Sequence, residues 1–210
     1  MSLLLPLASD TGRLGHSWTV QVGQFWRAPK SQDQMVQHLL CLACEDLLNK
    51  NGERWVLLNN YRLAGPSLLP QALNAATAEP EYPSGTVYSS PAVPGADIDK
   101  LIYFGASIFW RASMADCSRA VPLIGLGCTY DEQFRQHLHG EAEFPRNAIL
   151  WVAVVRSEEP PPLVNFPVGE IEAKHHQHHF DIFGLSYMLL RGRQPSVRRD
   201  KILMSEPQSD

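Results

Sequence analysis

The stretch from Asp97 to Met114, DIDKLIYFGASIFWRASM, constrains the fold more than any other part of the sequence. Its apolar and small residues recur with the period of an α-helix, and the opposite side of that helix is apolar as well. Charged residues are confined to the first turn and to Arg111 in the last turn, an arrangement that suits both ends of the helix dipole. A helix that is apolar nearly all round must be buried, so this segment predicts a central core helix.

The segments before the core helix predict further helices and loops. Glu45–Lys50 is followed by Asn51 and Gly52, which predicts a helix with a glycine stop. Trp55–Asn60 is too short to distinguish a strand from a further helical turn. Residues 80–95 are rich in proline and glycine and predict a surface loop that leads into the core helix. Other helices are expected from a capping box at Ser31 and Gln34, over Pro66–Ala76 and, after the core, over Asp131–His139.

The last third of the chain predicts strands. Ile149–Val155 is a continuous apolar run of strand length and predicts a buried strand. Leu163–Val168 and Phe180–Leu190 are the other strand candidates, with Gly184 marking a bulge in the second. Helices come first and strands last, so the expected fold class is α+β. It has a central buried helix at about 97–114, flanking helices and a small antiparallel C-terminal sheet.

Length and composition fit one domain. The 210 residues are 44% hydrophobic and 19% charged, enough for one sizeable core. We expect an irregular N-terminal segment at 1–30, a single globular domain at 31–190 that contains the CxxC motif, and a flexible charged tail at 191–210. The net charge of −4 gives no global positive field for nucleic acid, so such binding would depend on local basic residues of the tail. These are Arg191, Arg193, Arg198, Arg199 and Lys201, for which a solvated tail is the alternative role.

Cysteine usage predicts a reducing compartment. The four cysteines, Cys41, Cys44, Cys117 and Cys128, are too few for a disulfide scaffold, and two of them form a CxxC. The opening MSLLLPLASD lacks a basic start and is interrupted by Pro6, so it is a poor signal peptide. No run approaches the roughly 20 apolar residues that a membrane span requires. We therefore expect a cytoplasmic protein without membrane contact.

Cys41 and Cys44 are the first candidates for chemistry. Two cysteines separated by two residues can turn both sulfurs toward one point, which makes half of a tetrahedral zinc site. No second cysteine pair completes it, because Cys117 and Cys128 are isolated in the sequence. Thiol redox chemistry and plain packing of two small residues are the alternatives, and the absence of a βαβ context disfavours redox chemistry.

Four ordered segments resemble a group of uncharacterised bacterial proteins. They are LLCxxCE at Leu39–Glu45, NGExWVL at Asn51–Leu57, KLxYFxxSIFWRAS at Lys100–Ser113 and LGxxYxEQxRxxLxGE at Leu126–Glu141. The resemblance covers roughly residues 35 to 190. Members of that group resemble HNH-like treble-clef proteins, in which an earlier cysteine pair or an SHxxP histidine motif and LLCxxCE together form a zinc knuckle. The resemblance implies a zinc-supported module of a kind met in nucleases and in defence or mobile-element proteins.

The chain departs from this pattern before residue 41. No cysteine precedes Cys41, and the earlier histidines, His16 and His38, stand in no SHxxP context. Either the first half of the motif has been lost or residue 1 lies inside a longer gene. An HNH nuclease also needs a histidine that activates water and further ligands for a divalent ion, and no positions of this chain match them. Whether the protein is an enzyme therefore stays open.

Four histidines form the most conspicuous polar cluster: His175, His176, His178 and His179. Imidazole nitrogens at these spacings can bind a divalent metal and could complete the cysteine site. The cluster directly precedes a predicted strand, where alternation sends His176 and His178 to one face. A solvated strand entry and a protonation switch near neutral pH are the alternatives.

Two other groups are more consistent with structure than with chemistry. Arg111 at the end of the core helix must find a carboxylate, a carbonyl or an aromatic face, and a phosphate contact is its sharper alternative. His137 and His139, with Glu132 and Glu141, could form an acid–base group, but helical spacing places the two histidines on different faces. No nucleophile elbow or phosphate-binding glycine loop occurs in the sequence.

Three hypotheses about function follow. The first is an HNH-like zinc-binding or relic zinc-binding protein, related to nucleic acids, defence or mobile elements and without nuclease activity of its own. Its expected cofactor is zinc, and its candidate metal ligands are Cys41, Cys44, His176 and His178. The second is a metal-free protein-interaction or scaffold domain, and the third is a divalent-metal-dependent HNH-type endonuclease. Neither a substrate nor a partner follows from the sequence.

Overall fold

The computed structural model of the chain describes residues 39–60, 68–76, 86–89, 95–115, 125–155, 167–172, 175–182, 184–192 and 201–205. The irregular segment predicted at 1–30 and the capping box at Ser31 lie outside these residues. So do Cys117, residues 163–166 of a predicted strand, and residues 193–200 of the predicted tail.

Helix α4, Ile98–Met114, is the predicted core helix. It begins at the N-cap residue Asp97, whose side chain accepts a hydrogen bond from the Lys100 backbone N–H at 3.1 Å. Its charged residues stay at the two ends, as the sequence predicted, and its middle is buried all round. The buried residues are Leu101, Phe104, Gly105, Ala106, Ser107, Ile108, Phe109 and Trp110.

A second long helical segment packs on α4. It consists of α1 (Leu42–Leu48), a π-helical turn η1 (Asn49–Glu53) and α2 (Arg54–Asn60), which follow one another without a break. The predicted stop at Gly52 is therefore wrong, and residues 55–60 are helical. Gly52 instead lies against α4, where an added Cβ would be 2.9 Å from the Phe104 nitrogen. Its missing side chain allows two backbones to approach closely, and this packing outweighs its weak preference for ending a helix.

Two shorter helices complete the helical part that is described. The helix α3, Leu68–Asn74, lies within the predicted Pro66–Ala76. The helix α5, Cys128–Leu138, begins three residues before the predicted start, after the N-cap residue Gly127. Gly140, with φ of 73°, follows it as predicted.

The described strands form one sheet, in the order β1-β6-β2-β5-β4-β3. The neighbours are antiparallel except β2 and β6, which are parallel. The strands are β1 Thr86–Ser89, β2 Ala148–Val155, β3 Val168–Glu172, β4 His175–Ile182, β5 Leu185–Arg191 and β6 Lys201–Ser205. The sheet thus includes β1, within the segment predicted as a loop, and β6, within the segment predicted as a flexible tail. Both are short strands whose pairing depends on partners distant in sequence, which no local pattern reports.

The segment Phe180–Leu190, predicted as one strand with a bulge, is divided between two strands. The chain reverses near Gly184, whose φ is 78°, and Ile182 pairs with Leu185 across the reversal. Positive φ is the conformation that glycine adopts at least cost, so the glycine marks a hairpin turn instead of a bulge.

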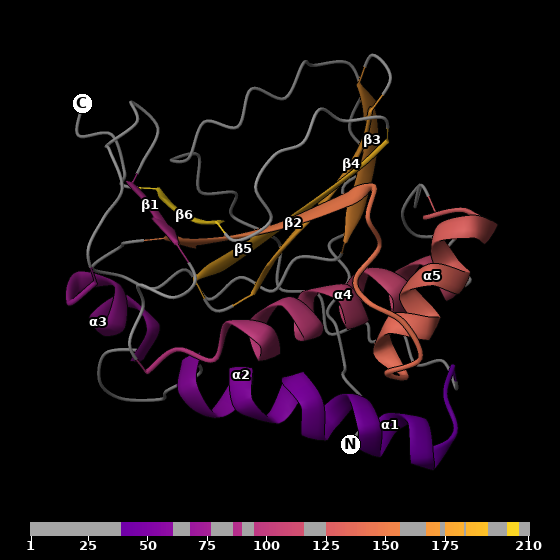
Figure 1. Ribbon diagram of the computed structural model, residues 1–210, viewed down its shortest axis with the longest axis horizontal. Helices are drawn as coiled ribbons and strands as arrows, with labels where there is room; N and C mark the ends of the chain where they lie inside the picture. The colour runs from indigo at the N-terminus through magenta and orange to yellow at the C-terminus, as the bar shows by residue number, and fades with distance from the viewer. Residues whose placement is uncertain are drawn as a thin grey trace, which may run out of the picture.

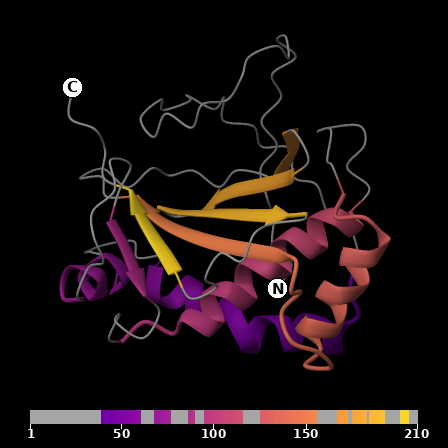
Figure 2. The same cartoon turned by 45° about the horizontal axis from the view of Figure 1, so that its top comes forward.

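The helices and the sheet form layers, with α4 in the middle. Figures 1 and 2 show α1 and α2 on one side of α4, the sheet on its other side, and α5 beside one end of α4. Aromatic rings join α4 to the sheet: Phe104 of α4 meets Tyr187 of β5 edge-on at 5.7 Å, and Tyr187 in turn stacks on Phe180 of β4 at 4.7 Å. An α+β fold around a central buried helix is therefore confirmed.

Candidate functional site

The thiol groups of Cys41 and Cys44 lie together at the start of α1. Cys41 is the N-cap residue with an extended backbone, φ −75° and ψ 160°, and its sulfur accepts a hydrogen bond from the Cys44 backbone N–H at 3.4 Å. The two sulfur atoms are 3.1 Å apart, so either thiol can donate a hydrogen bond to the other. The spacing predicted from the sequence therefore brings both sulfurs to one point.

The two cysteines differ in exposure and in acidity. Cys41 is exposed, whereas Cys44 is partly buried. The pKa of Cys41 is lowered, first because the Cys44 thiol donates a hydrogen bond to its sulfur and then because the Cys44 backbone N–H does so. The pKa of Cys44 is raised, mainly by the same hydrogen bond to Cys41. The hydrogen bond between the two thiols thus shifts their pKa values in opposite directions.

The distance between the sulfurs lies between the sulfur–sulfur distance of a disulfide and that of two thiolates bound to one zinc ion. Two thiolates on one tetrahedral zinc ion, with Zn–S bonds of about 2.3 Å, are about 3.8 Å apart. Two sulfurs in a disulfide are about 2.05 Å apart. A separation of 3.1 Å is within about 1 Å of either state, a difference that side-chain rotation can supply.

Apolar side chains are exposed beside the cysteine pair. Leu42, the residue after Cys41, is 84% exposed, and Leu39 is 38% exposed. Ala43 is exposed as well. The thiol groups thus lie beside exposed apolar side chains at the start of α1.

His176 and His178, the other predicted metal ligands, lie on β4 and face Arg191 of β5. Arg191 donates from Nε to His178 Nε2 at 3.2 Å, and its NH2 group lies 2.9 Å from His176 Nδ1. The same NH2 group donates to the Gly125 carbonyl at 3.0 Å, and the guanidinium carbon lies 5.3 Å from the centre of the Tyr130 ring. These histidines share one strand face, as alternation predicts.

The structure does not bring these histidines to the cysteines. Across the described ranges, no group of three or more His, Cys, Asp or Glu side chains is placed to hold a metal ion. His176 and His178 each point a nitrogen at a cation, which opposes metal binding there. The cysteine pair and the histidine pair are therefore separate features.

Arg191 also lowers the basicity of both histidines. Burial, then the Arg191 charge and those of the neighbouring histidines, lowers the pKa of His178 to about 4. The pKa of His176 is lowered by burial and by Arg191. His178, 5% exposed, is therefore neutral at pH 7, and a switch near neutral pH does not apply to it.

Arg191 is the residue of this cluster that the sequence prediction placed wrongly. It was assigned to the flexible charged tail, whereas it ends β5 and is only 9% exposed. The strand β5 alternates between buried and less buried residues from Leu185 to Arg191. In the sequence, the spacing of two residues from Tyr187 through Leu189 to Arg191 places Arg191 on the same strand face as these two residues.

Arg111 forms a structural tie between η1 and α4. Its NH1 group lies 3.6 Å from the carboxylate of Glu53, which is buried, and its Nε donates to the Ser107 carbonyl at 3.3 Å. Burial raises the pKa of Glu53, and the charge of Arg111 opposes that rise. Of the partners expected from the sequence, a carboxylate and a carbonyl are thus both observed.

The polar groups of α5 pair with one another and with Glu141, which follows the helix. Arg135 contacts Glu132 and Glu141, each at 2.9 Å, so neither carboxylate is paired with a histidine in this contact. His137 packs edge-on against the Phe144 ring at 5.3 Å. This arrangement fits a surface helix and no acid–base group.

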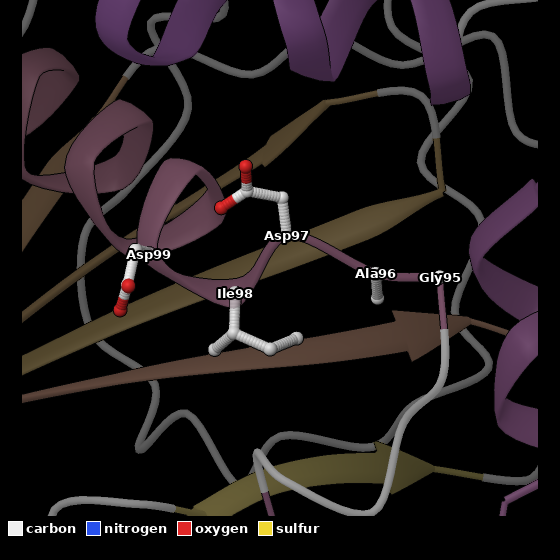
Figure 3. A pocket seen from close by; sticks show the side chains of 5 residues that line it. All are labelled: Gly95, Ala96, Asp97, Ile98 and Asp99. Atoms are coloured by element: carbon white, nitrogen blue, oxygen red, sulfur yellow. The ribbon is translucent and has the colours of Figure 1, made fainter.

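A shallow hollow lies at the start of α4, lined by residues 95–99. Figure 3 shows the Asp97 and Asp99 carboxylates pointing in different directions. Asp97 is also engaged by Lys100, whose Nζ lies 2.9 Å from its carboxylate. The hollow therefore brings no pair of carboxylates to one point.

Comparisons with protein-family models, with curated proteins and with solved structures find no match for this chain. Among the helices that the structure describes, none has both the length and the apolar character needed to cross a membrane.

Proposed function

We propose that the protein binds zinc and that Cys41 and Cys44 supply two of its thiolate ligands. The observation that carries the proposal is the 3.1 Å separation of two accessible sulfurs at the start of a helix. Zinc binds thiolates, so the lowered pKa of Cys41 favours the form that coordinates the metal. The resemblance of LLCxxCE to HNH-like proteins supports the same assignment.

The proposal is for a binding site and not for a hydrolytic one. Zinc takes four ligands, and the pair provides two of them. The other two positions take further donors or water. Hydrolysis of a phosphodiester needs a base near the metal, and His176 and His178 instead contact Arg191. Zinc bound to the two cysteines would have a structural role, because it would hold the first turn of α1 in place.

The metal content of the purified protein tests the proposal. Protein purified without chelators should carry about one zinc ion per chain, measured by elemental analysis. The variant with both Cys41→Ser and Cys44→Ser should carry none. Cys128→Ser is the matched control, because Cys128 is also an exposed cysteine in the first turn of a helix.

The proposal would be overturned in favour of a metal-free scaffold if the wild-type protein carried no zinc as purified and still carried none after incubation with zinc and removal of the excess. Equal zinc content in the double variant would do so as well, because the metal would then lie elsewhere.

A further inference from the structure

The geometry of the same pair points to a second activity: we propose that, when free of metal, Cys41 and Cys44 undergo thiol–disulfide exchange with small-molecule disulfides, Cys41 attacking and Cys44 resolving. This inference uses the residues of the zinc proposal but does not rest on zinc binding. A chain that never binds zinc can carry out the exchange, and a zinc-binding chain can fail to.

The distance and the backbone make an intramolecular disulfide accessible. The sulfurs need to approach from 3.1 Å to about 2.05 Å. Cys41 is the N-cap residue, and its own backbone is extended and not helical, with φ −75° and ψ 160°. Its carbonyl still accepts the Glu45 N–H at 3.0 Å, which anchors the residue while its side chain rotates. Closing the ring therefore leaves α1 intact.

Exposure assigns different roles to the two thiols. A disulfide must approach the attacking sulfur in line, which the exposed Cys41 permits and the partly buried Cys44 hinders. The exposed Leu42 side chain beside Cys41 offers an apolar contact to the incoming molecule. Once Cys41 carries a mixed disulfide, the Cys44 sulfur is already adjacent to it.

The exchange balances in two steps. The Cys41 thiolate attacks one sulfur of a disulfide RSSR, the S–S bond breaks, and RS⁻ leaves and takes a proton from water. Cys44 then gives its proton to water and attacks the Cys41 sulfur, and the second RS⁻ leaves and is protonated. The protein dithiol has lost two electrons and two protons, and RSSR has become two RSH.

The test uses the full chain, reduced, stripped of metal with a chelator and mixed with glutathione disulfide at pH 8. Mass spectrometry of the intact chain and of its peptides should show loss of two hydrogens, located at Cys41 and Cys44, with release of two equivalents of glutathione. Cys44→Ser should instead accumulate a glutathione adduct on Cys41. Cys41→Ser should react at least about tenfold more slowly at this site. Cys128→Ser, the exposed-cysteine control, should behave like the wild type.

Three results would overturn the inference: a stable adduct on wild-type Cys41 without ring closure, equal rates for wild type and Cys41→Ser, or Cys128 reacting as fast as Cys41. Elemental analysis reads metal content and this assay reads thiol oxidation, so either proposal can fail alone. If both hold, adding zinc should slow the exchange, because the bound thiolates are no longer free to attack.

Discussion

Burial and the Arg191 guanidinium hold the pKa of His178 at about 4, whereas an unperturbed histidine titrates at 6.5. Between pH 6.5 and pH 4, His178 is protonated in the unfolded chain and neutral in the folded chain. The contribution of His178 to the free energy of unfolding is therefore fully present above pH 6.5 and is lost as the pH falls toward 4. The loss from this residue amounts to roughly 3 kcal/mol at most.

Urea unfolding at a series of pH values between 7 and 4.5 measures this effect. His178→Gln should reduce the dependence of the free energy of unfolding on pH, because the titrating group is gone. This holds whatever the stability of the variant is at pH 7. His179→Gln is the control for the substitution, since His179 lies on the other face of β4 from His176 and His178. A wild-type stability that does not change over this range would contradict the prediction, as would an unchanged slope in His178→Gln.

Residue-level prediction from the sequence worked where the cause is local. The convergence of Cys41 and Cys44 follows from a spacing of three residues at one helix start, so the pattern alone located the pair. The environment of His176 and His178 does not follow from local sequence. It depends on the register that pairs His176 with Arg191, and that register is set by the reversal near Gly184. Reading Gly184 as a bulge hid the contact.

At the scale of elements, the π-helical turn η1 is where the α1–α2 segment approaches α4 most closely. An added Cβ at Gly52 would lie 2.9 Å from the Phe104 nitrogen and 3.1 Å from the Lys100 carbonyl oxygen. Both are backbone atoms of a buried helix, so they yield only if the helices separate. Gly52→Ala should therefore destabilise the fold by about 1–3 kcal/mol in spite of the higher helix propensity of alanine.

Gly125→Ala is a control for the same substitution at a glycine outside the helices. An added Cβ at Gly125 would meet the Ser113 hydroxyl at 3.4 Å, an ordinary contact. Denaturant unfolding of both variants measures the difference. Equal stability of Gly52→Ala and wild type would show that α1–α2 can move away from α4 at little cost.

Elements were predictable where hydrophobic periodicity is strong and local. The helix α4 was located to within one residue at its start, because its apolar pattern leaves no other place for it than the core. The strand β1 was missed because proline and glycine surround a four-residue strand, and β6 because basic residues precede it. The strand β1 pairs with β6, Thr86 with Met204 for example, and β6 also pairs with β2, over separations that no local window spans.

At the scale of the whole molecule, the layered arrangement connects the cysteine pair to the core. The pair lies at the start of the segment α1–η1–α2, which packs on α4, and α4 packs on the sheet. Glu53 of η1 and Arg111 of α4 fix the first of these contacts. If α1–η1–α2 unfolds together with α4 and the sheet, a ligand that stabilises the first turn of α1 stabilises the whole fold.

Bound zinc should accordingly raise the melting temperature of the whole protein. A ligand that binds only the folded state adds RT ln(1 + [L]/Kd), about 2.7 kcal/mol when free zinc is about 100 times its Kd. For a domain of this size that corresponds to a rise of roughly 5–10 °C. Thermal unfolding with excess zinc and with chelator measures it in the wild type and in the double variant Cys41→Ser, Cys44→Ser. The double variant should show no rise, and Cys128→Ser should show the full one. If zinc protects only the amides of α1 from hydrogen exchange and leaves the melting temperature unchanged, α1 opens independently of α4, and the coupling between the layers is absent.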